Sequence, residues 1–161
     1  MRRLQRTLEE IGWTRDVPRL SEHDPVARAA EAMRRESHDC VLVMNDDQLA
    51  GIFTSRDFLN RVAARGGDPA TTELASVMTR SPRTLGPDDP VAFAINWMAI
   101  EGFRNVPIVD DGGAILGVLT VWDVMRHLND VFDEIEATPR PTPPQSEISE
   151  VINMVDLGGG G

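Results

Sequence analysis

Two copies of a threonine and an aspartate three residues apart are the part of this chain best suited to chemistry. Thr54 and Asp57 follow one apolar run, and Thr120 and Asp123 follow another. A carboxylate at such a position can accept charge-assisted hydrogen bonds from a polar ligand. It can equally cap the helix that begins there, because aspartate is favoured at helix starts. The spacing by itself leaves both roles open.

Both pairs belong to an internal repeat. The segment from Gly51 to Asp57 (GIFTSRD) recurs 66 residues later from Gly117 to Asp123 (GVLTVWD). A second motif, Asp-Pro-Val-Ala, begins at residue 24 and recurs 65 residues later. Two motifs that keep nearly one period predict two copies of one supersecondary unit.

Each copy reads as strand, helix, strand, strand, helix. In the first copy the strands are expected at 17–20, 40–44 and 49–53, and the closing helix at 57–64. In the second copy the strands are expected at 83–85, 106–109 and 115–119, with a last helix from about Trp122. Asp24 and Asp89 are predicted as N-caps of the intervening helices, with a proline in each first helical position.

The last helix carries an apolar seam with alternating spacings of four and three. Its members are Val121, Met125, Leu128, Phe132 and Ile135. Leu4, Leu8 and Ile11 repeat this spacing on an expected N-terminal helix. Such a seam packs on another helix, so the two could pack together or each could contact a second protomer.

The expected fold class is α+β, built from two α/β-type repeats of the β-α-β-β-α kind with pseudo-two-fold symmetry. The expected divisions are an N-terminal helix at 1–12, the first repeat at 13–67, the second repeat with its extended last helix at 68–136, and a tail at 137–161. The tail combines a proline-rich linker with a short amphipathic segment that is too short to be a stable helix alone.

Composition excludes several classes of function. A formal charge of −10 argues against binding to nucleic acids or anionic membranes, which need a basic surface. Cys40 is the single cysteine, so an intrachain disulfide is excluded and a cytoplasmic location is expected. It is expected in the core, and His23 and His127 are expected at the surface, since neither has a partner at metal-ligand spacing. No nucleophile and base set is recognisable, so the chain is not expected to be an enzyme.

The repeat resembles the cystathionine-β-synthase (CBS) domain pair, also called a Bateman module. The carriers of the resemblance are the Gly-(Ile/Val)-(Phe/Leu)-Thr-x-x-Asp motif in both copies, the strand Asn105–Val109 and the linker Val77–Pro82. It extends from about Ile11 to Leu128. The first copy departs from the pattern, because Trp13 replaces the opening methionine and Val41 replaces the strand proline.

The resemblance implies a regulatory sensor that binds an adenosine-containing ligand, such as AMP, ADP, ATP or S-adenosylmethionine, in two clefts between the repeats. For cleft one it implies Thr54, Arg56, Asp57 and His38, completed by Thr84, Leu85, Asn105 and Val106. For cleft two it implies Thr120, Asp123 and Arg104, completed by Pro18, Leu20, Asp39 and Cys40. In each cleft the aspartate would hold the ribose hydroxyls, and an arginine would bind phosphate.

Cleft one is expected to bind nucleotide better than cleft two, because Trp122 stands where cleft one has Arg56. The resemblance implies no required cofactor and no metal site, although Mg²⁺ could accompany a polyphosphate. It also implies a homodimer, and the last helix or the tail could dock a protein partner. The alternative is a ligand-independent interaction or scaffold module with vestigial clefts.

Overall fold

The computed structural model describes residues 6–136 of the 161-residue chain. Residues up to Leu128 form one unit that contains both repeats, and a second unit begins at Asn129. The predictions for Leu4, for the side chain of Ile135 and for the tail lie outside the described residues.

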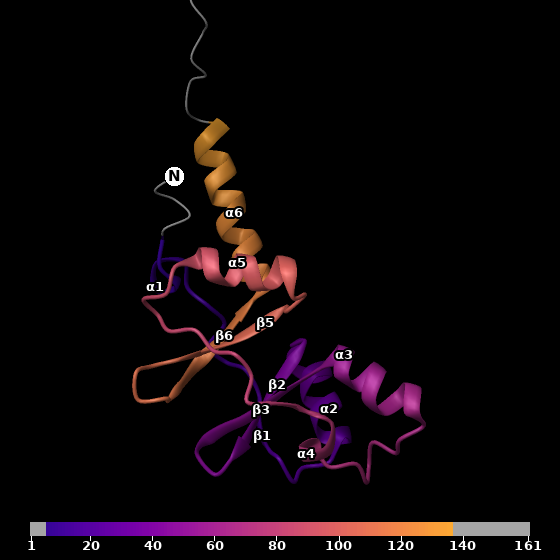
Figure 1. Cartoon of the computed structure of the whole chain (residues 1–161). Coiled ribbons are helices and arrows are strands. Elements are labelled where there is room, and N and C mark those ends of the chain that lie inside the picture. Colours follow the sequence, from indigo (N-terminus) through magenta and orange to yellow (C-terminus); the bar gives the residue numbers. More distant parts are fainter. Residues whose placement is uncertain (1–5, 137–161) are drawn as a thin grey trace, which may run out of the picture. The chain divides into compact units, whose positions relative to one another are not determined.

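The first repeat is built on a four-stranded sheet (Figure 1). Its strands are β1 (Arg19–Ser21), β2 (Cys40–Asn45), β3 (Gln48–Thr54) and β4 (Thr79–Arg80). β1 and β2 are parallel, whereas β2 with β3 and β3 with β4 are antiparallel. The crossover between β1 and β2 is helix α2 (Val26–Glu36).

The helix predicted after β3 is present but irregular. It begins as α3 (Ser55–Asp57), continues as the π-helical turn η2 (Phe58–Val62), and ends in the 3₁₀ turn η3 (Ala63–Arg65). Gly66 then adopts a left-handed conformation at φ +67°, which glycine tolerates and which ends the helix. The short helix α4 (Leu74–Val77) connects this region to β4.

The second repeat has the same topology with a smaller sheet. Helix α5 (Val91–Ile100) precedes the antiparallel strands β5 (Asn105–Val109) and β6 (Ile115–Thr120), and α6 (Val121–Glu136) follows them. The strand expected at 83–85 is reduced to one parallel bridge between Leu85 and Ile108. The mixed helix and strand fold with two repeats is therefore confirmed.

Residues near the start of each repeat complete the sheet of the other repeat. Thr79, near the start of the second repeat, pairs with Ile52 of β3, and Thr14, near the start of the first, pairs with Val118 of β6. Gly117 permits the second approach, since a Cβ there would lie 2.3 Å from the carbonyl oxygen of Thr14. The repeats are therefore joined by exchanged edge segments.

Three clusters of apolar side chains hold this unit together. One lies within each repeat, and Phe53 and Leu119 are fully buried members of the first and second. The third cluster joins the repeats, because it contains Leu42 and Ile52 of the first together with Val118 of the second. Cys40 belongs to this third cluster and is 2% exposed, as expected for a core residue.

The helix starts differ from prediction by one residue. Pro25 and Pro90 are the N-caps of α2 and α5, so Asp24 and Asp89 lie one position earlier. The carboxylate of Asp24 accepts from the backbone N–H of Ser21, and that of Asp89 accepts from Gly86. Both aspartates therefore stabilise the turn before the helix rather than its first N–H groups.

Helix α6 turns a different face inward than the seam predicted. Asp123, Val124 and His127 are buried, whereas Trp122 and Met125 are 73% and 53% exposed. The prediction that His127 lies at the surface was wrong, since it is only 4% exposed. The sequence pattern was misleading because a polar aspartate and a histidine share the buried face.

The N-terminal helix is also shorter than predicted, since α1 covers only Leu8–Ile11.

Candidate functional site

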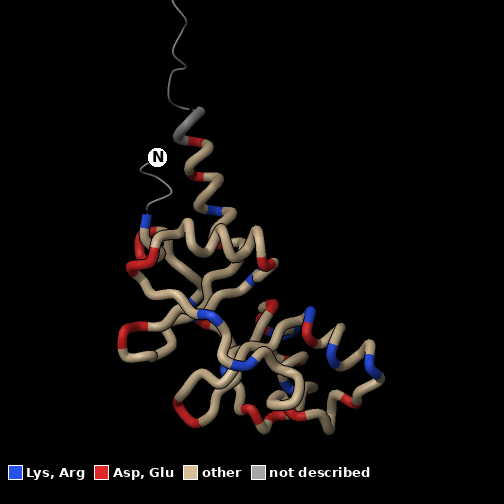
Figure 2. Tube along the Cα trace, in the orientation of Figure 1, with Lys and Arg blue, Asp and Glu red and all other residues tan. Residues whose placement is uncertain are grey.

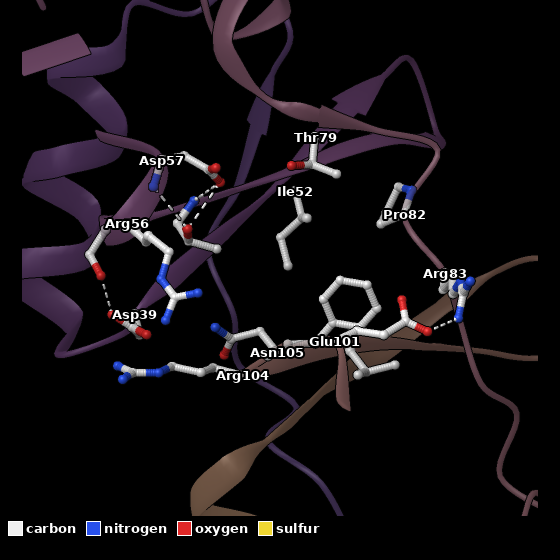
Figure 3. Close-up of a pocket in the computed structure, with 15 residues that line it drawn as sticks. Asp39, Ile52, Arg56, Asp57, Thr79, Pro82, Arg83, Glu101, Arg104 and Asn105 are labelled. Carbon is white, nitrogen blue, oxygen red and sulfur yellow. Dashed lines mark hydrogen bonds and ion pairs between the residues drawn. The ribbon is translucent and has the colours of Figure 1, made fainter. Parts of the chain in front are cut away.

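A pocket of about 260 Å³ lies between the two repeats (Figure 3). The first repeat contributes the end of β3, the start of α3 and Asp39, which precedes β2. The second contributes the loop at 101–104 and the start of β5, and the linker after β4 supplies the remaining wall. The lining residues are Asp39, Ile52, Thr54, Ser55, Arg56, Asp57, Thr79, Pro82, Arg83, Glu101, Gly102, Phe103, Arg104, Asn105 and Val106.

The threonine and aspartate of the first repeat form a capping box at the start of α3. Thr54 is the N-cap, and its hydroxyl accepts from the backbone N–H of Asp57 at 3.2 Å. The Oδ2 of Asp57 accepts in return from the backbone N–H and the hydroxyl of Thr54, at 3.0 and 2.9 Å. The capping role is therefore real, and it uses only one of the two carboxylate oxygens.

The other oxygen of Asp57 pairs with an arginine. Oδ1 lies 3.3 Å from Nε of Arg61, one turn further along the chain. Arg61 is held by two further bonds, which it donates to the carbonyl of Val77 and the hydroxyl of Thr79. Asp57 is thus fixed in place and 14% exposed, it lines the pocket, and its Oδ1 has a second lone pair beyond the one directed at Arg61.

Two guanidinium groups in the pocket form no ion pair in the described part of the chain. Within residues 6–136, the side chains of Arg56 and Arg104 have no hydrogen-bonding or ion-pair partner. Both lie near Asp39 in Figure 3, and Asp39 instead accepts a hydrogen bond from the hydroxyl of Ser55. Arg56 and Arg104 come from different repeats, so an anion between them would connect the two halves of the unit.

A third arginine in the pocket is already occupied. Arg83 forms an ion pair with Glu101 at the end of α5 (Figure 3). Its guanidinium also stacks over the ring of Trp97, 5.3 Å from the ring centroid. The linker between the repeats is therefore held against the second repeat at the edge of the pocket.

The second Thr-x-x-Asp is enclosed. Asp123 is 5% exposed, and its Oδ2 accepts from the backbone N–H of Thr120, from the hydroxyl of Thr120 and from the hydroxyl of Thr14. Its Oδ1 accepts from Arg126 at 3.2 Å. Both oxygens are thus engaged, and one of them by Thr14, which lies 109 positions away in the sequence.

Most residues assigned to cleft one lie together in the pocket. These are Thr54, Arg56, Asp57, Asn105 and Val106. His38 and Thr84 are partly buried outside the lining, and Leu85 is buried in the core of the second repeat.

The residues assigned to cleft two are dispersed. Arg104 and Asp39 line the pocket beside Arg56, and Thr120 bonds to the enclosed Asp123. Leu20 and Cys40 are core residues. Pro18 is partly buried, and its carbonyl accepts from the N–H of Leu42.

Several lining residues were not foreseen from the sequence. Glu101, Gly102 and Phe103 directly precede the predicted strand at Asn105, and Arg83 follows the linker motif. Their nearness in sequence to these two motifs was the one indication that they could line the pocket. What the sequence lacked was the turn at Gly102, at φ +74°, whose Cβ position lies 3.9 Å from Nη1 of Arg56.

Charge is unevenly distributed over residues 6–136. Figure 2 shows acidic residues on turns of both repeats and basic residues where the repeats meet. In this part of the chain, no group of three histidine, cysteine or acidic residues could hold a metal ion. The helices of the same part include none that is long and apolar enough to cross a membrane.

Comparisons with known proteins agree on one family. The family model that describes the CBS domain matches the chain twice, at residues 13–64 and 74–130. The meiotically up-regulated gene 70 protein of Schizosaccharomyces pombe is 34% identical over 69% of this chain, and the match spans 16% of that protein.

Solved structures show the same fold. A putative signal-transduction protein with CBS domains from Burkholderia ambifaria matches with a TM-score of 0.71 at 22% identity, covering 86% of this chain and all of that one. The CBS domain protein PAE2072 from Pyrobaculum aerophilum, solved in complex with AMP, matches with a TM-score of 0.66 at 22% identity. That match covers 73% of this chain and 89% of the other.

Proposed function

We propose that this chain, which belongs to the CBS domain family, is a regulatory module that binds an adenosine-containing nucleotide in the pocket between its repeats. The observation that carries the proposal is the convergence on one cavity of Asp57 with Arg56 and Arg104, neither of which is ion-paired within residues 6–136. PAE2072 and a second protein of this fold, CBSX2, have been solved as complexes with AMP, which supports this choice of ligand.

The proposed binding mode follows from the chemistry of the lining. The carboxylate of Asp57 accepts from the ribose hydroxyls, because charge-assisted bonds of this kind are stronger than neutral ones. Arg56 and Arg104 bind the phosphate, since a guanidinium matches phosphate oxygens with two parallel donors. Ile52, Pro82 and Val106 provide apolar contacts for the base.

The first pocket is the stronger nucleotide site in this proposal. Asp57 lines the pocket and is 14% exposed, whereas Asp123 is 5% exposed and accepts an additional hydrogen bond from Thr14. Trp122 replaces Arg56 at the second motif and offers no cation for phosphate. Nucleotide at the first pocket would connect the repeats through Arg56 and Arg104, and thereby shift the population of their relative arrangements.

The module acts as a homodimer in this proposal. Support comes from large apolar side chains that are more than half exposed in the unit up to Leu128, namely Leu59, Phe93, Ile100, Trp122 and Met125. Analytical ultracentrifugation of the full chain tests the assembly. A sedimenting monomer at high micromolar concentration would contradict it.

Ligand binding is tested by a thermal-shift screen of the full chain against AMP, ADP, ATP, S-adenosylmethionine and NAD, followed by titration calorimetry. A ligand at a hundred times its dissociation constant should stabilise the fold by about 2.7 kcal/mol. Asp57→Ala should abolish the shift. Asp111→Ala is the matched control, because Asp111 is exposed in the turn between β5 and β6. No shift with any ligand would favour the scaffold alternative.

A further inference from the structure

The balance of charge in the pocket distinguishes a nucleoside monophosphate from a polyphosphate. Three arginines and three carboxylates, those of Asp39, Asp57 and Glu101, line the cavity, and two of the arginines, Arg56 and Arg104, have no ion-pair partner within residues 6–136. A phosphate monoester carries about −1.5 to −2 charges at neutral pH, which two guanidinium groups can meet. Each additional phosphate group brings further negative charge that these two arginines cannot neutralise.

Arg83 is the cation that a longer phosphate chain would need. It lines the same pocket, but its guanidinium is ion-paired with Glu101 and stacked on Trp97. Glu101 also lines the pocket and is one-third exposed, so its negative charge faces the same space. Glu101 therefore neutralises the charge of Arg83, and its carboxylate would also repel any additional phosphate group in the pocket.

We propose that Glu101 is a specificity-determining residue that makes the pocket favour a nucleoside monophosphate over a nucleoside triphosphate. The inference rests on the proposed function and refines it at the same site. When Glu101 no longer binds Arg83, the stacking of Arg83 on Trp97 keeps its guanidinium at the pocket.

The test is titration calorimetry of the full chain with AMP and with ATP, both in the presence of EDTA so that Mg²⁺ does not neutralise the phosphates. The unmodified chain should bind AMP more tightly than ATP. In Glu101→Gln, the affinity ratio of ATP to AMP should rise about tenfold, equivalent to about 1.4 kcal/mol. The affinity for AMP should change by less than about threefold, since its phosphate is met by Arg56 and Arg104.

Two further variants separate the local effect from a general effect of charge. Glu31→Gln removes a glutamate that pairs with Arg34 on the exposed face of α2, so it changes the net charge equally at a distance from the pocket. It should leave the affinity ratio unchanged. The double variant Arg83→Gln with Glu101→Gln should lose the gain for ATP, because the released cation is then absent.

The outcomes separate this inference from the proposed function. If the unmodified chain binds no adenosine nucleotide, the proposed function fails and this inference with it. If the chain binds AMP but Glu101→Gln gives the same ratio as Glu31→Gln, only the role of Glu101 is overturned. A double variant that retains the gain for ATP, or an unmodified chain that prefers ATP, also overturns it.

Discussion

Removing the two equivalent aspartates should have opposite consequences for binding and for stability. Asp57→Ala acts on a carboxylate that faces a pocket, and Asp123→Ala acts on one that is 5% exposed. The sequence motif around each is the same, and both form a capping box with the preceding threonine. The shared cap does not distinguish the variants, so the difference in stability should come from the burial and the additional partners of each carboxylate.

The magnitude follows from the donors that each variant leaves unpaired. Asp123→Ala removes the acceptor of three donors around a carboxylate that is 5% exposed, two on Thr120 and one on Thr14, and it also removes the ion pair with the exposed Arg126. A buried donor without a partner costs about 1–3 kcal/mol, and hydroxyl rotation recovers part of that, so we expect a loss of about 3–5 kcal/mol. Asp57→Ala frees two donors on Thr54 beside a pocket that admits water, so we expect about 1–2 kcal/mol.

The assay is urea denaturation of both variants and of the control Asp111→Ala, with and without AMP. A difference of about 2 kcal/mol corresponds to a shift of about 1 M in the urea midpoint at ordinary slopes. AMP should raise the midpoint of folded Asp123→Ala and leave that of Asp57→Ala unchanged. Equal destabilisation of the two variants, or AMP stabilisation retained only by Asp57→Ala, would refute the reasoning.

Three further predictions concern the packing of the unit. In urea denaturation, Gly117→Ala should lower the free energy of unfolding by more than about 3 kcal/mol, because φ is +151° and the added Cβ would overlap the carbonyl oxygen of Thr14. Gly113→Ala is the control: its φ is +82° but the space around it is open, so it should cost only about 1 kcal/mol. Burial raises the pKa of Cys40 to about 12 from 9.0, so above pH 9 the unfolded chain loses this proton first. Stability should then fall by up to about 1.4 kcal/mol per pH unit, and alkaline denaturation curves of Cys40→Ala should lack that slope. The Nε2 of His127 is buried with no hydrogen-bonding partner in the described part of the chain. His127→Leu should therefore raise the free energy of unfolding by about 1 kcal/mol in urea denaturation, and a loss of stability would contradict this.

The repeat, the order of its elements and the class of fold were determined by the sequence, because period and apolar pattern are local properties. Two motifs with nearly equal spacing were enough to predict two copies of one unit, and strand boundaries agreed within one or two residues at β2, β3, β5 and β6. The same pattern failed on α6, where Asp123 and His127 occupy the buried face. A polar residue can be buried when tertiary neighbours supply its hydrogen-bonding partners. The spacing of apolar residues alone cannot predict such a buried polar residue.

Only the tertiary structure decided which aspartate faces a pocket. Asp57 and Asp123 close the same Thr-x-x-Asp motif, yet Thr14, more than a hundred residues away, donates to Asp123. The lining of the pocket was likewise decided by the turn at Gly102, which brings Glu101 and Arg104 beside Arg56 and Arg83. These contacts form because the segments at Thr14 and Thr79 each pair with a strand of the other repeat. Such pairings join residues far apart in sequence, so the local motif could not predict them.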